Sequence, residues 1–176
     1  MTTAPLPIRR LVLLLGFMGS GKTTVGRLLA RRLGWSFVDL DEEIERREGR
    51  TIRQIFEASG EPFFRQVERE LLEELLRRGQ QESLVLALGG GTVAQPGSLE
   101  FLRAHGGITV WLDCPLEELR RRCRGLTQRP LFQDAARFRA LFEQRLPFYR
   151  QADFRVAADK ADPERVVEDI LQCVTF

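Results

Sequence analysis

The chemically most informative residues of this chain form a glycine-rich run, Gly-Phe-Met-Gly-Ser-Gly-Lys-Thr, at positions 16–23. The run follows an apolar stretch at 11–15 and precedes a helix-like stretch at 24–33, the strand–turn–helix context of a phosphate-binding loop. Glycines let backbone N–H groups curl around an anion, and the following helix adds its positive N-terminus. The spacing predicts that Lys22 bridges the β- and γ-phosphates of a nucleotide and that the Thr23 hydroxyl is a Mg²⁺ ligand.

Two carboxylates, Asp39 and Asp41, follow a second apolar segment at 36–39. In a strand-like segment residues i and i+2 point the same way, so both side chains are expected at the crevice beside the strand ends. Either aspartate could instead cap a helix over 41–48. We expect at least one of them to contact metal or substrate.

Three consecutive glycines, Gly89, Gly90 and Gly91, end a third apolar segment at 84–88. Many phosphate-loop proteins carry a magnesium-associated aspartate at such a strand end. Because glycines stand there in this chain, the acidic group must come from elsewhere. Glycines cost conformational entropy, so their benefit is expected to be close approach of the backbone to a small ligand. The alternative is a flexible connection.

Arginines supply candidate anion contacts. Arg65 and Glu68 share one face of a predicted helix, where the carboxylate can hold the guanidinium for bidentate anion recognition. Arg129 lies in a segment at 124–134 that contains Gly125 and few apolar anchors and resembles a mobile lid. Arg145 lies in the following helix. Taken alone, each of these arginines would be interpreted as a solvated surface residue.

The elements that position these residues alternate between short apolar runs and longer amphipathic runs. Strands are predicted at 10–15, 36–39, 84–88, 108–112 and 154–156, and helices at 22–33, 41–48, 51–59, 61–78, 98–104, 115–123, 134–150 and 163–173. The alternation predicts a single α/β domain over residues 1–176, with a five-stranded parallel sheet in a three-layer α/β/α arrangement. The helical region at 41–78 is expected to be an insertion on the active-site side.

Composition excludes several classes of function. The chain has 176 residues, a net charge of +2, three cysteines and one histidine, which speaks against a disulfide framework and a multi-histidine metal site. No apolar run is long enough for a membrane span or a signal peptide, so we expect a cytoplasmic protein without a membrane partner. An arginine cluster at 120–124 is interleaved with acidic residues, and a phosphate- and carboxylate-bearing substrate explains it without nucleic acid.

The ordered set of motifs resembles shikimate kinase, over about residues 11–174. It comprises G-F-M-G-S-G-K-T-T-V-G-R-L-L-A from Gly16, D-x-D from Asp39, F-R from Phe64, L-G-G-G-T-V from Leu88, R-P-L from Arg129, and R-x-P-x-Y from Arg145. The resemblance implies a P-loop fold of nucleoside-monophosphate-kinase-like topology. It also implies ATP-dependent phosphorylation of the 3-hydroxyl of shikimate, in the route to chorismate and aromatic amino acids, with Mg²⁺ as cofactor. We expect a monomer.

The resemblance also assigns roles. The catalytic residues would be Lys22, Asp41 and Arg129. ATP would be bound by Gly19, Ser20, Gly21, Lys22, Thr23, Thr24, Arg122 (stacked on adenine) and Arg129. Shikimate would be bound by Asp41, Arg65, Gly89, Gly90, Gly91 and Arg145, with Glu68 bracing Arg65. Mg²⁺ would be held by Thr23 and Asp39. Departures from the family pattern are modest: Leu40 between the aspartates, Pro62-Phe63 before Phe64, and Lys160 near the adenine loop at 159–163.

Two other readings remain. One is another small-molecule kinase of the same fold, such as a gluconate kinase, which should lack the combined D-x-D, F-R and triple-glycine set. The other is a ligand-sensing domain without turnover, which should show damage at Lys22, Asp41 or Arg129, or a fused DNA-binding region. The sequence has neither feature.

Overall fold

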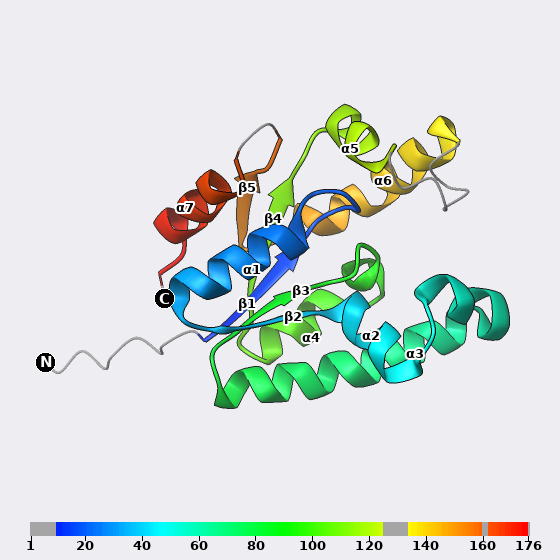
Figure 1. The fold of residues 1–176 in the computed structure, drawn as a ribbon, viewed down its shortest axis with the longest axis horizontal. Helices are drawn as coiled ribbons and strands as arrows, with labels where there is room; N and C mark the ends of the chain where they lie inside the picture. Colours follow the sequence, from blue (N-terminus) through cyan, green and yellow to red (C-terminus); the bar gives the residue numbers. More distant parts are fainter. Residues whose placement is uncertain (1–9, 125–133, 160–161, 176) are drawn as a thin grey trace, which may run out of the picture.

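The computed structural model describes residues 10–124, 134–159 and 162–175 (Figure 1). Its centre is a parallel sheet of five strands in the order β2-β3-β1-β4-β5. The strands are β1 (Leu11–Leu15), β2 (Ser36–Asp39), β3 (Leu84–Ala87), β4 (Ile108–Asp113) and β5 (Phe154–Ala157). This confirms the predicted sheet, and every strand boundary lies within one residue of its predicted position.

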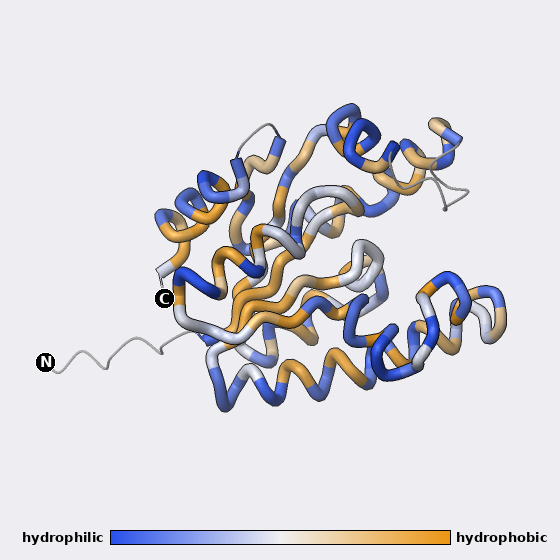
Figure 2. The backbone as a smooth tube through the Cα atoms, in the orientation of Figure 1, coloured by the Kyte–Doolittle hydropathy of each residue, from blue (hydrophilic) through white to orange (hydrophobic). Residues whose placement is uncertain are grey.

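Helices cover both faces of the sheet. They are α1 (Lys22–Leu33), α2 (Leu40–Glu48), α3 (Ile52–Gln81), α4 (Ser98–Ala104), α5 (Leu116–Cys123), α6 (Ala135–Tyr149) and α7 (Pro163–Cys173). The central strands β1 and β3 consist of apolar residues, which are orange in Figure 2, and buried side chains form two core clusters. Val12 and Leu14 of β1 pack with α1 and α7, whereas Leu13 and Leu15 pack with α3, α4 and α6.

The predicted helices at 51–59 and 61–78 join without a loop as α3. Gly60 interrupts the helix with φ 79° and ψ 171°, a conformation that favours glycine, and Pro62 follows it. The turns before Gly60 therefore run in a different direction from the long helix after it (Figure 1). A capping box of Thr51 and Gln54 starts the first part.

One short element was not predicted from the sequence: a 3-10 turn, η1 (Thr92–Ala94), directly after the three glycines. None of the helices in the described ranges combines the length and hydropathy that a membrane span requires.

Candidate active site

The loop between β1 and α1 has the geometry of an anion cradle. Gly21, the N-cap of α1, has φ 95° and offers no side chain to the first amides of the helix, which leaves them available to an external acceptor. Ser20 Oγ is buried and makes no hydrogen bond within the described part of the chain. Gly19 also lies in this loop, and Thr24 is exposed in the first turn of α1. These are the residues that the sequence assigned to phosphate binding.

Lys22 folds back onto this loop. Its Nζ donates to the carbonyl oxygens of Gly16 (2.8 Å) and Phe17 (3.1 Å). Burial lowers the pKa of Lys22, and the nearby carboxylates of Asp41 and Asp39 oppose that shift. A cation held in this way is desolvated, so an incoming phosphate can compensate for lost hydration.

The predicted metal pair is assembled. Thr23 Oγ1 donates to Asp39 Oδ2 at 2.5 Å, while Asp39 Oδ1 caps α2 by accepting from the amides of Asp41 (3.0 Å) and Glu42 (3.4 Å). The structure confirms that Asp39 is a helix cap, and its role as a metal ligand stays a prediction. The described residues contain no cluster of three or more metal-ligating side chains. A hydroxyl beside one carboxylate suits Mg²⁺, which takes few protein ligands and completes its shell with water and substrate phosphates.

Asp41 reaches the site by a different route from the one predicted. The chain becomes helical at Leu40, so Asp41 lies in the first turn of α2 and the alternation of an extended strand does not apply. The carboxylate nevertheless lines a cavity together with Lys22 and the three glycines. A Cβ built on Gly89 would lie 2.9 Å from Asp41 Oδ1, which shows how closely the carboxylate approaches the glycine backbone.

Two guanidinium groups converge at Gly91 in the same cavity. A Cβ built on Gly91 would lie 2.8 Å from Arg65 Nη2 and 3.0 Å from Arg145 Nη2. Arg65 Nη1 donates to Glu68 Oε2 at 2.7 Å, and Glu68 is buried. Arg65 Nε and Nη2 also donate to Glu61 Oε1 at 3.3 Å. A guanidinium has five N–H donors, so Arg65 retains donors for a further anion.

The cavity between these groups has a volume of about 150 Å³. Arg65 and Arg145 lie near Gly91, Asp41 lies near Gly89, and Lys22 joins them from the phosphate loop. Its lining residues are Met18, Lys22, Asp41, Ile52, Phe56, Phe64, Arg65, Glu68, Gly89, Gly90, Gly91 and Arg145. All six residues that the sequence assigned to substrate binding therefore meet in one space.

Two further residues hold the glycines in place, and sequence reasoning gave neither a role. Tyr149 donates its hydroxyl to the carbonyl oxygen of Gly90, and burial raises the pKa of Tyr149 to about 12, so the donor stays protonated. Thr92 Oγ1 donates to Glu68 Oε1 at 2.6 Å. Both residues stand in motifs already noted, Tyr149 in R-x-P-x-Y and Thr92 in L-G-G-G-T-V, but the motifs gave no role to either side chain.

Arg122 contacts backbone at the predicted adenine side. Its guanidinium donates to the carbonyl oxygens of Gly19 (3.3 Å) and Ala158 (3.0 Å), to that of Asp159, and to Glu118. It thereby joins the phosphate loop to the segment after β5. The predicted lid arginine, Arg129, most of the segment 124–134, and Lys160 lie outside the described residues.

Comparison with known proteins gives a consistent result. A family model described as shikimate kinase matches residues 18–175. The shikimate kinase of Persephonella marina is 42% identical over 92% of this chain and 97% of its own length, and that of Synechococcus elongatus is 45% identical over 92% and 84%.

Solved structures agree. The shikimate kinase of Aquifex aeolicus superposes with a TM-score of 0.81 at 41% identity, covering 92% of this chain and 94% of that one. The enzyme of Acinetobacter baumannii, in complex with shikimate, gives 0.86 at 41% identity over 94% and 92%. A gluconokinase from Sinorhizobium meliloti gives 0.60 at 19% identity and shares the fold alone. The chain belongs to the shikimate kinase family.

Proposed function

We propose that this protein transfers the γ-phosphate of ATP to the 3-hydroxyl of shikimate, releasing ADP and shikimate 3-phosphate. The observation that carries the proposal is the set of charged groups that line one cavity. Arg65 and Arg145 converge at Gly91, Asp41 lies against Gly89, and Lys22 enters from the phosphate loop. A carboxylate on the arginines would bring a ring hydroxyl towards Asp41 and the phosphate loop.

In this proposal Asp41 orients the 3-hydroxyl and accepts its proton as the oxygen–phosphorus bond forms, while the bond from the γ-phosphorus to the β-phosphate oxygen breaks. Lys22 leaves the carbonyl oxygens of Gly16 and Phe17 to neutralise charge on the β- and γ-phosphates. Glu68 keeps Arg65 directed at the substrate carboxylate. We assign Arg129 to the transferring phosphate by family resemblance.

Mg²⁺ is proposed as the cofactor, held by Thr23 Oγ1 and Asp39. When bound, it neutralises charge on the nucleotide phosphates. The support is the 2.5 Å contact between the two oxygens next to the phosphate loop. We also propose that the protein is cytoplasmic and monomeric. The monomer is supported by the surface: within the described residues Phe56, at 37% exposure, is the one exposed large hydrophobic side chain, and it lines the substrate cavity.

A coupled assay of ADP formation tests the proposal. The purified protein with Mg²⁺ and ATP should turn over rapidly with shikimate, and hardly at all with gluconate, with nucleoside monophosphates or without acceptor. Equal rates with gluconate would reject the shikimate assignment. Elution as a dimer in size-exclusion chromatography would reject the proposed monomer.

A further inference from the structure

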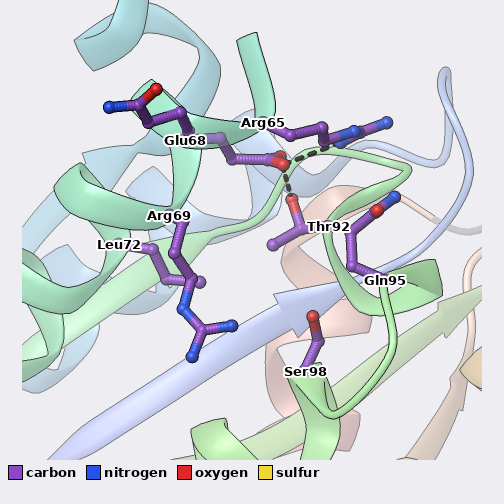
Figure 3. Close-up of a pocket in the computed structure, with 8 residues that line it drawn as sticks. Arg65, Glu68, Arg69, Leu72, Thr92, Gln95 and Ser98 are labelled. Atoms are coloured by element: carbon purple, nitrogen blue, oxygen red, sulfur yellow. Dashed lines mark hydrogen bonds and ion pairs between the residues drawn. The ribbon is translucent and has the colours of Figure 1, made fainter. Parts of the chain in front are cut away.

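The Glu68 carboxylate is a buried junction between two parts of the cavity. Only 3% of Glu68 is exposed, and each carboxylate oxygen has its own donor: Arg65 Nη1 on Oε2 at 2.7 Å and Thr92 Oγ1 on Oε1 at 2.6 Å. Figure 3 shows both contacts meeting at Glu68. An ionised carboxylate can only accept hydrogen bonds, so the threonine hydroxyl is the donor.

Thr92 belongs to the same loop as the three glycines. Its amide donates to the carbonyl oxygen of Gly89 at 3.1 Å, so its backbone position is tied to that of the glycine loop. A Cβ built on Gly89 would lie 2.9 Å from Thr92 Oγ1, 2.9 Å from Asp41 Oδ1 and 3.2 Å from Glu68 Oε1. The hydroxyl therefore links the glycine loop to the carboxylate that directs Arg65, a few ångströms from Asp41.

Open space behind this junction makes the link consequential. A second cavity, of about 320 Å³, borders Arg65, Glu68 and Thr92 and is drawn in Figure 3. Arg69 also lines this cavity, and its guanidinium carbon lies 4.2 Å from the centroid of the Phe101 ring. Within the described ranges Arg69 forms no ion pair. If Glu68 loses the hydrogen bond from Thr92, its carboxylate can therefore rotate into this cavity, towards Arg69.

The other acid on Arg65 cannot replace Glu68. Glu61 accepts from Arg65 at 3.3 Å, but its side chain is 60% exposed, and exposed ion pairs orient their partners weakly. Glu68 is thus the group that sets the direction of Arg65, and Thr92 is the group that sets Glu68.

We propose that Thr92 is a positioning residue for substrate recognition, holding Glu68 on the substrate side so that Arg65 stays beside Arg145. This inference rests on the proposed function, since it assigns Arg65 to the substrate carboxylate. It predicts an effect confined to one substrate: loss of the hydroxyl weakens shikimate binding and leaves ATP binding unchanged.

The test uses two substitutions at Thr92. Thr92→Val keeps the shape and removes the donor, whereas Thr92→Ser keeps the donor. We expect Thr92→Val to raise the KM for shikimate about tenfold, the ratio given by about 1.4 kcal/mol of lost binding. The KM for ATP should stay within about twofold of the wild-type value, as should both constants in Thr92→Ser, which retains the charge-assisted hydrogen bond.

A matched control exists in β4, which β1 separates from the strand that leads to the glycine loop. Thr109, at the start of β4, is buried and donates to the Asp153 carboxylate at 2.7 Å, the same type of contact as that of Thr92. Thr109→Val should lower the melting temperature without changing the KM for shikimate. If Thr92→Val does not fold, Thr92→Ala, which removes the donor with less crowding, takes its place with the same expected increase.

The outcomes separate this inference from the proposed function. An active wild type with an unchanged shikimate KM in the folded Thr92 variant overturns the positioning role and leaves the function intact. Equal increases in the KM for shikimate and for ATP would also overturn it, because they indicate general loosening. A wild type without shikimate turnover overturns the proposed function, and this inference with it.

Discussion

A single methyl group at Gly91 should disable carboxylate recognition while leaving the fold intact. Gly91 has φ −104° and ψ −4°, a conformation that alanine adopts without strain. The new Cβ would nevertheless lie 2.8 Å from Arg65 Nη2 and 3.0 Å from Arg145 Nη2. Since these atoms are the far ends of flexible side chains, they can move aside without disturbing the fold. The two guanidinium groups would then no longer converge at Gly91.

The magnitude follows from what that convergence provides. A hydrogen bond to a charged group contributes about 1.5–3 kcal/mol. Losing one such bond, at about 1.4 kcal/mol for each factor of ten, raises the KM for shikimate by about 10- to 150-fold in Gly91→Ala. The KM for ATP should change by less than about twofold, because the nearest atoms to a Cβ on Gly91 belong to Arg65 and Arg145 and not to the phosphate loop.

Steady-state kinetics and thermal unfolding of Gly91→Ala and Gly49→Ala form the assay. Gly49 ends α2 with φ 63° and has no atom within 4 Å of a built Cβ, so alanine there strains only the backbone. Gly49→Ala should lower the melting temperature with an unchanged KM, the reverse of Gly91→Ala. A Gly91→Ala enzyme with a wild-type KM for shikimate would refute the reasoning, because the arginines would then not act at Gly91.

Three further predictions concern individual groups. Asp41→Asn should lower kcat by about 10²–10⁴ in the coupled assay, the usual contribution of a positioned acid or base; full activity would leave Asp41 as a first-turn residue of α2. Asp39→Asn should raise the Mg²⁺ concentration for half-maximal rate with little change in melting temperature, since asparagine caps helices as well as aspartate does; an unchanged Mg²⁺ titration would contradict the metal role. Tyr149→Phe should raise the KM for shikimate about 2- to 10-fold, the worth of one net hydrogen bond to the Gly90 carbonyl oxygen, and an unchanged KM would limit Tyr149 to packing.

The sheet was predictable chiefly because its central strands β1 and β3 are apolar on both faces. Runs such as 11–15 and 84–88 have no polar side, so only burial between two helical layers suits them, and the structure confirms this. The phosphate loop was predictable because its chemistry requires particular residues at particular spacings. Residues that are adjacent in the chain, such as Gly21 and Lys22, are necessarily adjacent in the structure, so the loop they form could be predicted from their order.

Contacts between side chains that are far apart in the sequence could not be predicted in this way. Thr92 and Glu68 are 24 residues apart and meet only because the glycine loop packs against α3. The route of Asp41 was wrongly derived for a related reason: helix α2 starts at Leu40, and Asp39 caps it while also accepting from Thr23. One side chain can serve a local and a distant partner, and local patterns reveal only the first.

Selectivity in this site is a matter of distances between subsites, which no single motif encodes. The phosphate loop alone would accept many nucleotides, and the arginine pair alone would accept many carboxylates. Asp41 lines the same cavity of about 150 Å³, so in the proposed function a compact acceptor presents its hydroxyl at a fixed distance from its carboxylate. The glycine loop would set that distance, since Asp41 lies close to Gly89 and both arginines lie close to Gly91. On this proposal the groups that anchor the loop, the Tyr149 hydroxyl on Gly90 and the Thr92 hydroxyl on Glu68, contribute to recognition of the acceptor together with the groups that touch it.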